Sequence, residues 1–383
     1  MQSEKELGKW VEKRGSDDVF VTEARYALAN LYDDRSLYDE AMKHTEECIR
    51  VFRKGYGADH DKTTQAINLK TNILRKMGNL SDAINNYEHL LEVAREGNND
   101  QKVCAALNNL GLAYQEVGRN DDALKCMLEA VALHRKTSSD TQRLATTMLN
   151  IGQLYTNINQ LDEGKKFLDE ATKMMEQSST AKEAATTDAS QHPEVLKGLA
   201  MLNSGNILMM QENLDEALDH YTKCLDIFRR HLGEKNKMVG TVLTNMGDLL
   251  REQGKLCEAR ASHNKALKIM RSLEKQGAGC SASVANALAG LAAVFLTEKK
   301  AKEALELQEE ALEIRMGMPH GEDDEKVAEL YFNMAMSKTE LRDLPGVILC
   351  YEKALDVYKR VPGCDAEVKQ CKQMLDWFRR QRG

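Results

Sequence analysis

Proline, aromatic residues and β-branched runs are scarce in this chain. Only four of its 383 residues are proline and 5% are aromatic, whereas Ala, Leu, Glu, Lys and Met are abundant. Proline interrupts helices, and β-branched and aromatic residues are the ones that favour strands. The composition therefore predicts an all-helical protein.

The chain also lacks an excess of positive charge and any long apolar run. Its formal net charge is −7, whereas nucleic acids and anionic membranes both attract clustered Lys and Arg. Residues 1–18 have no apolar core of the kind that a signal peptide needs, and no later stretch reaches membrane-spanning length. We therefore expect a soluble, cytoplasmic protein whose partners are neither nucleic acid nor membrane.

Signatures of metal binding and catalysis are missing as well. The nine cysteines include no C-x-x-C pair, and Cys48, Cys126, Cys224 and Cys350 fall within helical apolar patterns, as reduced core thiols do. The nine histidines are scattered, and no zinc-protease, P-loop, nucleophile-elbow or dinucleotide-binding motif occurs. We expect no metal, no cofactor and no catalysis.

One segment recurs eight times along the chain. Its copies align on a small residue, here called the anchor, which is Ala41, Ala83, Ala123, Gly164, Ala217, Ala259, Ala304 or Val347. Successive anchors are 40 to 45 residues apart, except for one interval of 53 residues. A period of this length is typical of repeat architectures.

Each copy has the pattern of two antiparallel helices. A large residue nine positions before the anchor, such as Tyr114, shares a helical face with a small residue three positions earlier, such as Gly111. After the anchor, large and small residues alternate at plus four and plus seven, as an interlocking helix pair requires. The turn between the helices carries residues that tolerate the left-handed conformation, namely Gly78, Gly118, Asn159 and Gly254.

This order of small residue, aromatic, Gly turn, Ala, aromatic and Ala, as in "NLGLAYQEVGRNDDALKCMLEA", resembles the tetratricopeptide repeat. The period near 42 residues resembles the lengthened form in kinesin light chains, while HEAT repeats share the period but not this order. The resemblance covers about residues 20–360 and implies a right-handed α-solenoid, a superhelix of about eight hairpins. Kinesin light chains carry a long heptad coiled coil ahead of their repeats, for which residues 1–20 are too short. We therefore expect either a fragment or a different use of the repeats.

Five segments follow from this pattern. Terminal repeats each leave an apolar face unpaired, so that capping helices are expected at both ends. The interval between the fourth and fifth repeats is rich in Ser, Thr and Ala, which predicts an enlarged loop, with a longer helical end as the alternative. A second, shorter loop is expected at 271–283. The segments are a capping helix at 1–20, four repeats at 21–175, the loop at 176–193, four repeats at 194–360 and a capping helix at 361–383.

The position fourteen residues before each anchor favours asparagine. This position, the asparagine column, reads Ala27, Leu69, Asn109, Asn150, Asn203, Asn245, Gly290 and Asn333. Asn within a helix costs on the order of 0.6 kcal/mol relative to Ala, so that five copies are unlikely to be accidental. Either each amide stitches its repeat to the next, or the amides line the inner face and hold the backbone of an extended peptide, since an amide both donates and accepts. In the resembling family, Asn at this place lines the peptide groove, which favours the second interpretation for the central four.

Neighbouring columns are candidates for specificity. They lie fifteen and eleven residues before the anchor and include Asn108, Leu149, Leu202, Leu112, Gln153, Asn206 and Asp248, although the leucines suit packing between repeats equally well. Few basic residues accompany them, apart from Arg75 and Arg251, so that a neutral or mildly apolar extended peptide or short helix is the expected ligand. Two alternatives remain, a kinesin or other cytoskeletal adaptor and a structural component of a ciliary or microtubule-associated assembly. The oligomeric state is left open.

Overall fold

The computed structural model describes residues 2–35, 37–58, 60–137, 141–179, 192–318, 321, 324–361 and 363–382. Within these ranges the regular elements are α-helices and no strand occurs, which confirms the all-α prediction. Among the same residues, no helix is both long enough and apolar enough to cross a membrane.

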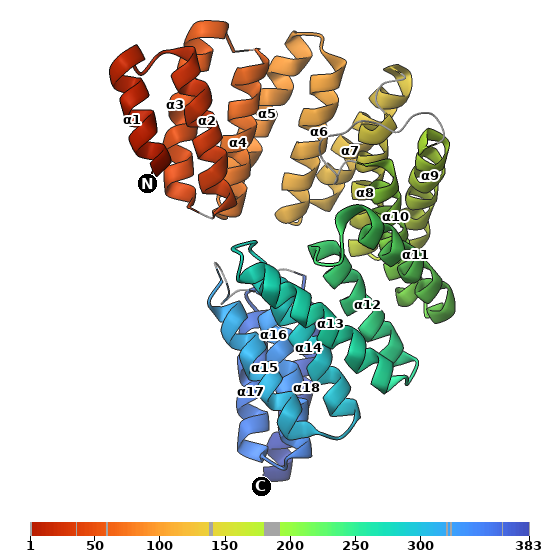
Figure 1. Cartoon of the computed structure of the whole chain (residues 1–383). Coiled ribbons are helices and arrows are strands. Elements are labelled where there is room, and N and C mark those ends of the chain that lie inside the picture. Colours follow the sequence, from red (N-terminus) through yellow and green to blue (C-terminus); the bar gives the residue numbers. More distant parts are fainter. Residues whose placement is uncertain are drawn as a thin grey trace. The chain divides into compact units, whose positions relative to one another are not determined.

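The chain divides into two compact units, Met1–Ala185 and Thr186–Gly383, which are described separately. The first unit holds nine helices in its described part (Figure 1). These are α1 (Gln2–Arg14), α2 (Val19–Asp34), α3 (Tyr38–Tyr56), α4 (Asp61–Lys76), α5 (Leu80–Glu96), α6 (Asp100–Glu116), α7 (Asn120–Thr137), α8 (Thr141–Asn157) and α9 (Leu161–Ser179).

The second unit likewise holds nine helices where the structure describes it. They are α10 (Pro193–Met210), α11 (Leu214–Leu232), α12 (Lys237–Glu252), α13 (Leu256–Glu274), α14 (Ser281–Thr297), α15 (Ala301–Met316), α16 (Glu325–Glu340), α17 (Leu344–Tyr358) and α18 (Asp365–Arg382).

Consecutive helices pack as hairpins in both units (Figure 1). The even-numbered helices from α2 to α16 are the first helices of these hairpins, and the odd-numbered helices from α3 to α17 are the second helices. Helix α1 packs on α2, and α18 packs on α17. Helices with substantial mutual contact are neighbours or next but one along the chain. Each unit is therefore an α-solenoid of helical hairpins, as the repeat predicts.

In the seven hairpins from α4–α5 to α16–α17, the turn places one residue in the left-handed conformation, five positions before the anchor. The four residues predicted from sequence, Gly78, Gly118, Asn159 and Gly254, have φ between 59° and 79°, which confirms that prediction. Three further hairpins use Glu212, Lys299 and Arg342 at the same place, with φ of 60° or 61°.

Small residues of the first helices allow close approach of the second helices. A Cβ placed on Gly152 would lie 2.6 Å from Leu168 Cδ2, and one on Gly205 would lie 2.6 Å from Tyr221 Cε1. Leu168 and Tyr221 each stand four residues after an anchor and are fully buried. The alternation of small and large residues in the sequence thus produces the contact surface within each hairpin.

Some boundaries differ from the expected ones. Helix α1 ends at Arg14 and α2 begins at Val19, so that the segment 1–20 contains the whole of α1 and also the first two residues of α2. Helix α13 continues to Glu274 and α14 begins at Ser281, which shortens the loop expected at 271–283. Of the loop expected at 176–193, residues 176–179 belong to α9 and residues 180–191 lie outside the described residues.

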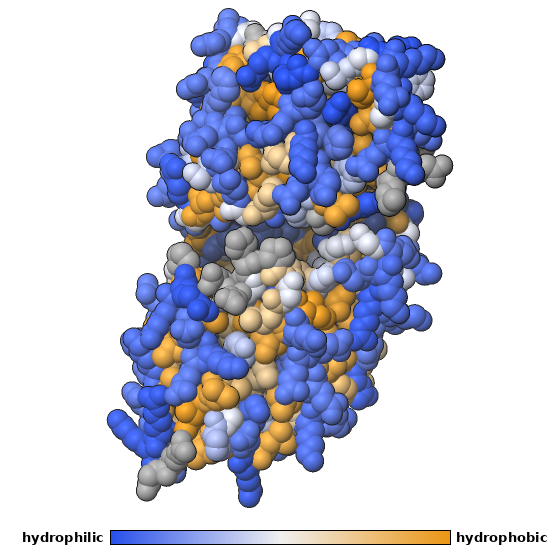
Figure 2. All heavy atoms as spheres, turned by 90° about the vertical axis from the view of Figure 1, so that its left-hand side faces the viewer, coloured by the Kyte–Doolittle hydropathy of each residue, from blue (hydrophilic) through white to orange (hydrophobic). Residues whose placement is uncertain are grey.

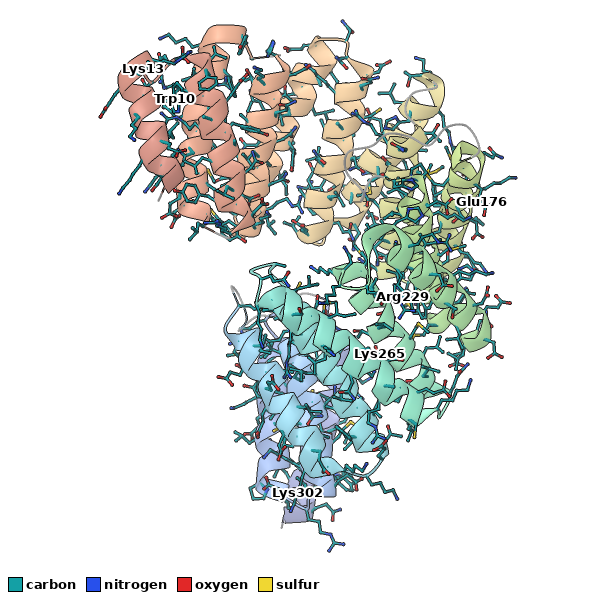
Figure 3. All side chains as sticks on the ribbon, in the orientation of Figure 1. Trp10, Lys13, Glu176, Arg229, Lys265 and Lys302 are labelled. Atoms are coloured by element: carbon teal, nitrogen blue, oxygen red, sulfur yellow. The ribbon has the colours of Figure 1, made fainter. Side chains whose placement is uncertain are left out.

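The surface is predominantly hydrophilic, as the 30% of charged residues requires. Figure 2 shows one face, on which hydrophobic side chains form strips between hydrophilic ones. On α1, Trp10 is 37% exposed, and the Nζ of the neighbouring Lys13 lies 5.9 Å from its ring centroid (Figure 3). At the other end, Cys371, Leu375 and Phe378 of α18 are buried in a cluster with α17.

Candidate functional site

The predicted amide residues lie at the surface of the first helices. Asn109 on α6, Asn150 on α8, Asn203 on α10 and Asn245 on α12 are all half-buried. Each occupies the same position of its repeat, fourteen residues before the anchor. The repeat therefore places these side chains, one per hairpin, on a common face. We call this surface, made by the even-numbered helices α2 to α16, the first-helix face of its unit.

In the first unit, two of these amides join successive hairpins. Asn150 Nδ2 donates a hydrogen bond to Asn108 Oδ1 over 3.0 Å, which connects α8 to α6. Asn108 belongs to the neighbouring column, one residue earlier in the repeat. This pair is the stitching contact that the sequence left open as one of two interpretations.

A corresponding pair occurs in the second unit, with a tyrosine added. Asn245 Nδ2 and the Tyr221 hydroxyl both donate to Asn206 Oδ1, each over 2.8 Å. Tyr221 comes from α11 and is fully buried, and burial raises the pKa of its hydroxyl, which keeps the proton on the donor. The network ties α10, α11 and α12 together. Tyr87 and Asn72 form the same contact within the α4–α5 hairpin, at 3.0 Å.

The remaining two central asparagines carry no such bond. Within the described ranges no hydrogen bond is recorded for the side chain of Asn109 or of Asn203, although both are half-buried. The asparagine column therefore contains two kinds of member, those engaged with the next hairpin and those with their amide groups unoccupied.

The leucines proposed for specificity pack inside the units. Leu149 and Leu202 are each only 6% exposed, which favours the alternative role in packing between repeats that the sequence left open for them. Their position, fifteen residues before the anchor, is one step around the helix from the half-buried asparagine column. Leu112 and Gln153 are half-buried, and Gln153 Nε2 donates to Asn157 Oδ1 over 2.9 Å.

A continuous trough crosses the first-helix face of the second unit. It consists of three adjoining hollows of about 680, 380 and 260 Å³. The first and second share Asn245 and Asp248, while the second and third share Arg251, Leu330 and Asn333. The trough therefore runs from α10 past α12 and α14 to α16.

Small residues on α14 form part of the trough. Ala289, Gly290 and Ala293 line it and contribute almost no side chain. Gly290 interrupts the asparagine column for a steric reason, because a Cβ there would collide with Cε1 of His263. His263 on α13 also fills the space beside Gly247, where a Cβ would lie 2.5 Å from its Nε2.

His263 stands beside one carboxylate of the trough. Its Nε2 lies 3.5 Å from Asp248 Oδ1, and neither ring nitrogen has a hydrogen-bond partner in the described part of the chain. Complete burial lowers the pKa of His263 to about 4, so that the imidazole is neutral at physiological pH. Burial raises the pKa of Asp248 to about 6, although Arg251 and Lys326 oppose this shift.

Most cations along the trough are paired. Arg251 bonds to Glu252, and Lys326 pairs with Glu329 over 2.5 Å. Arg315, only 8% exposed, donates to Asp324 and to Asn286, both over 2.6 Å. The trough therefore presents few free positive charges, in keeping with the expectation from sequence.

The first unit contains a smaller hollow of about 160 Å³ between α4, α5 and α6. Asn68 of the column fifteen residues before the anchor lines it, together with Leu90 and Lys102.

Among the described residues no group of three His, Cys, Asp or Glu side chains is placed to hold a metal ion. All nine cysteines are free. Cys48, Cys224 and Cys350 are buried, and burial raises the pKa of their thiols.

Several residues of the trough were not predicted as site residues. Tyr221 appears in the sequence as a packing residue four positions after its anchor, and only its hydroxyl makes it part of the site. Met209 and Met210 lie at the end of α10, where no repeated pattern marks them, and Glu212 lies at the turn position, which the repeat marks for its conformation and not for a ligand contact. The hydroxyl of Tyr221 was the one available signal, because a buried Tyr needs a polar partner.

Comparison with known proteins agrees with the repeat pattern. The tetratricopeptide repeat family matches residues 20–96, 102–177, 198–272 and 283–365, which is most of the chain. The chain is 24% identical over 301 residues to the protein Kinesin light chain-related 1 of Arabidopsis thaliana and 23% identical over 301 residues to Kinesin light chain-related 2 of that species. The alignments cover 77% of this chain but only 46% and 43% of those two proteins. The chain thus spans less than half the length of these relatives.

Two solved structures share the fold. The BtubC protein of P. vanneervenii is 20% identical, with a TM-score of 0.50 over 64% of this chain and 91% of that one. A signal transduction ATPase with a tetratricopeptide repeat sensor from Pyrococcus horikoshii is 14% identical, with a TM-score of 0.57 over 91% of this chain and 52% of that one. With the hairpins, the turn geometry and the family match in agreement, the chain belongs to the tetratricopeptide repeat family.

Proposed function

We propose that this chain is a protein-interaction scaffold whose first-helix face binds an extended segment or short helix of a partner protein. The observation that carries the proposal is the incomplete use of the amide pairs. Each pair joins two hairpins and still presents hydrogen-bonding groups at a half-buried surface. An exposed peptide backbone offers the matching donors and acceptors at every residue.

The hydrogen-bond capacity of the pairs can be counted. Each Asn side chain has two N–H donors and a carbonyl oxygen that accepts. In the pair of Asn206 and Asn245, the Asn206 oxygen receives two bonds, while no bond is recorded to the Asn245 oxygen or from Asn206 Nδ2 within the described residues. The pair of Asn108 and Asn150 likewise uses one oxygen and one N–H. The same side chains thus support both the stack and a ligand.

The trough of the second unit supports an extended ligand rather than a compact small molecule. Its three hollows adjoin along four first helices, whereas a drug-sized ligand fills one enclosed cavity. Leu330 and the small residues of α14 provide apolar contact, and Asn245 and Asn333 provide polar contact. This mixture suits a peptide that is recognised through its backbone and a few side chains.

The test uses peptide selection and asparagine variants. A display library of random peptides about twelve residues long is selected on the purified chain, since about 3.3 Å per extended residue is enough to span several helices. Binding of the selected peptides is then measured for the double variant Asn109→Ala, Asn203→Ala. These amides bond to nothing in the described residues, so that removal of both should weaken binding about thirtyfold, at about 1 kcal/mol for each of two lost hydrogen bonds, without lowering the melting temperature.

The matched control is the double variant Asn85→Ala, Asn264→Ala, whose side chains are exposed on the second helices α5 and α13. It should bind the selected peptides like the wild type. Unchanged binding by the Asn109 and Asn203 variant would refute a peptide-binding role for these two amides. A clear fall in its melting temperature would show that these amides have a structural role instead, as expected for Asn150→Ala.

A kinesin light chain-like cargo or motor adaptor in the cytoplasm is the second candidate, and the two similar Arabidopsis proteins favour it. This chain spans less than half of those proteins. The resemblance therefore does not extend to contacts that their other parts make with a motor. Co-purification of the chain with kinesin heavy chain, compared with the Asn109 and Asn203 variant, distinguishes the candidates. Motor binding that survives in the variant supports an adaptor that uses another surface.

A further inference from the structure

The largest hollow of the trough has walls of two chemical kinds. It measures about 680 Å³ and lies between α10, α11 and α12. Met209, Met210 and Leu214 supply apolar surface, and Glu212, Asp248 and Glu252 supply carboxylates. We call these six residues the acidic pocket. Asn206 and Asn245 adjoin it, so that a peptide held by this amide pair would direct a side chain into it.

Two of the three carboxylates lack a cationic partner. Glu252 is paired with Arg251, whereas no ion pair is recorded for Glu212 among the described residues. The nearest basic group to Asp248 is His263 at 3.5 Å, and that imidazole is neutral. Arg251 and Lys326 act on Asp248 only from a longer range, and they do not offset the effect of its burial. The pocket therefore has an uncompensated negative charge.

A comparison with the preceding hairpin indicates that this charge is not needed for folding. The position of Asp248, eleven residues before the anchor, is occupied there by Asn206, and the position of His263 is occupied by Tyr221. Tyr221 and Asn206 satisfy each other over 2.8 Å. In the next hairpin the fully buried imidazole of His263 points to Asp248 but makes no hydrogen bond, and the carboxylate faces the pocket. The neutral, hydrogen-bonded pair of one hairpin is thus replaced in the next hairpin by Asp248 and His263, which leave an anion at the surface of the trough.

We propose that the acidic pocket binds a basic side chain, Lys or Arg, of the partner peptide. A long aliphatic stem packs against Met209, Met210 and Leu214, since thioethers adapt to the shape of such a stem. The cationic end group then lies between Glu212, from the turn after α10, and Asp248, from α12. Acidic peptide residues are rejected there because like charges would meet in a partly desolvated site.

The proposal rests on the proposed peptide-binding function and sharpens the expected ligand from a neutral segment to one with a basic residue. The probes are four libraries of about nine random residues, in which the central position is Arg, Lys, Leu or Glu. Binding to the full chain is measured by fluorescence anisotropy of the labelled libraries. The Arg and Lys libraries should bind about tenfold more tightly than the Glu library, and the difference should shrink at high salt.

The variant Glu212→Gln, Asp248→Asn removes the two unpaired charges and keeps the side-chain shapes. It should lose the preference for Arg and Lys while still binding the Leu library. The control Asp226→Asn, Glu258→Gln removes two exposed carboxylates from the second helices α11 and α13 and should keep the preference. Circular dichroism spectra and melting curves verify that both variants are folded.

The outcomes separate the two claims. If no library binds the wild-type chain, the proposed function fails and this inference fails with it. If libraries bind without preference for a basic residue, or if the Glu212 and Asp248 variant keeps that preference, the acidic pocket is overturned while the scaffold function stands. Equal loss of all four libraries in this variant would also overturn the inference, since it would assign the carboxylates a structural role.

Discussion

At the scale of single residues, the same amino acid at the same repeat position has different roles. Asn150 and Asn245 bond to the preceding hairpin, whereas Asn109 and Asn203 do not bond within the described residues. The sequence predicted the column but not this division. The acceptor lies fifteen residues before the anchor in one pair and eleven before it in the other, so that no single offset in the sequence marks the partners.

The contact of His263 with Asp248 was also beyond sequence reasoning. Each residue is a departure from its column, and only the structure shows that the two departures meet. The broken asparagine column at Gly290 has the same origin, because the imidazole occupies the space that a side chain would need.

This pair predicts opposite pH effects on stability. The pKa of His263 falls from 6.5 to about 4 on folding, so that the unfolded chain binds more protons between these values and stability is lost as the pH falls through them. The pKa of Asp248 rises from 3.8 to about 6, so that its effect has the opposite sign, with stability lost as the pH rises through that window. The charged neighbours Arg251, Glu252 and Lys326 are the same in all variants compared.

Denaturant unfolding at about pH 7 and about pH 4.5 measures the two effects against the wild type. His263→Gln should gain roughly 1–3 kcal/mol in relative stability at the lower pH. Asp248→Asn should gain relative stability at the higher pH. Shifts of the same sign in both variants would contradict the assigned protonation states.

At the scale of helices and turns, the repeat pattern predicted the hairpins well. Glycine or asparagine marked four turns, and the remaining turns could not be recognised because Glu212, Lys299 and Arg342 have no preference for the left-handed region. Hairpin packing holds these residues in that conformation, at a cost of about 1 kcal/mol or more each. The four turns with glycine or asparagine were enough to align the repeats with one another. The turns that lack glycine therefore did not obscure the fold.

Replacing Lys299 or Arg342 by Gly should therefore stabilise the protein. We expect about 0.5–1 kcal/mol for each, since relief of strain exceeds the added flexibility of the unfolded chain. Urea unfolding gives the free energy. Gly118→Ala is the reverse experiment, because φ is 76° there and no atom lies near the added Cβ, so that only backbone strain is introduced and stability should fall. Loss of stability in Lys299→Gly would indicate that the lysine side chain supports the turn.

At the scale of the whole molecule, contacts between helices are local along the chain. The boundary between the two compact units falls in the one long interval between anchors, which the sequence displayed as an enlarged spacing. The trough was not predictable in this way. It depends on Ala289, Gly290 and Ala293 coinciding on α14. These residues occupy the three columns fifteen, fourteen and eleven residues before the anchor, but the columns alone do not show that three small side chains together leave a hollow.

Because each helix packs mainly against its neighbours along the chain, we expect a packing defect in one hairpin to destabilise only the nearby helices. Gly152→Ala would force a Cβ within 2.6 Å of Leu168 and should destabilise by about 1–3 kcal/mol. Hydrogen exchange with mass spectrometry should detect faster exchange than in the wild type in α8 and α9. The acceleration should be smaller in α6 and α7, and exchange in α16 to α18 should be unchanged. Gly55→Ala on α3, where no atom lies within 4 Å of the added Cβ, should leave exchange unchanged or slower. Uniform acceleration after Gly152→Ala would show that the chain unfolds as one cooperative body.

The hydrogen bonds of the two amide pairs also run in the same direction along the chain, from the later hairpin to the earlier one. In both, the residue from the earlier hairpin, Asn108 or Asn206, receives the bond and retains free N–H groups, and the residue from the later hairpin, Asn150 or Asn245, donates the bond and retains its oxygen. A backbone lying across either pair meets donors on one side and an acceptor on the other. If the proposed peptide lies across either pair, we expect the fixed order of donor and acceptor to favour one N-to-C direction of the bound backbone.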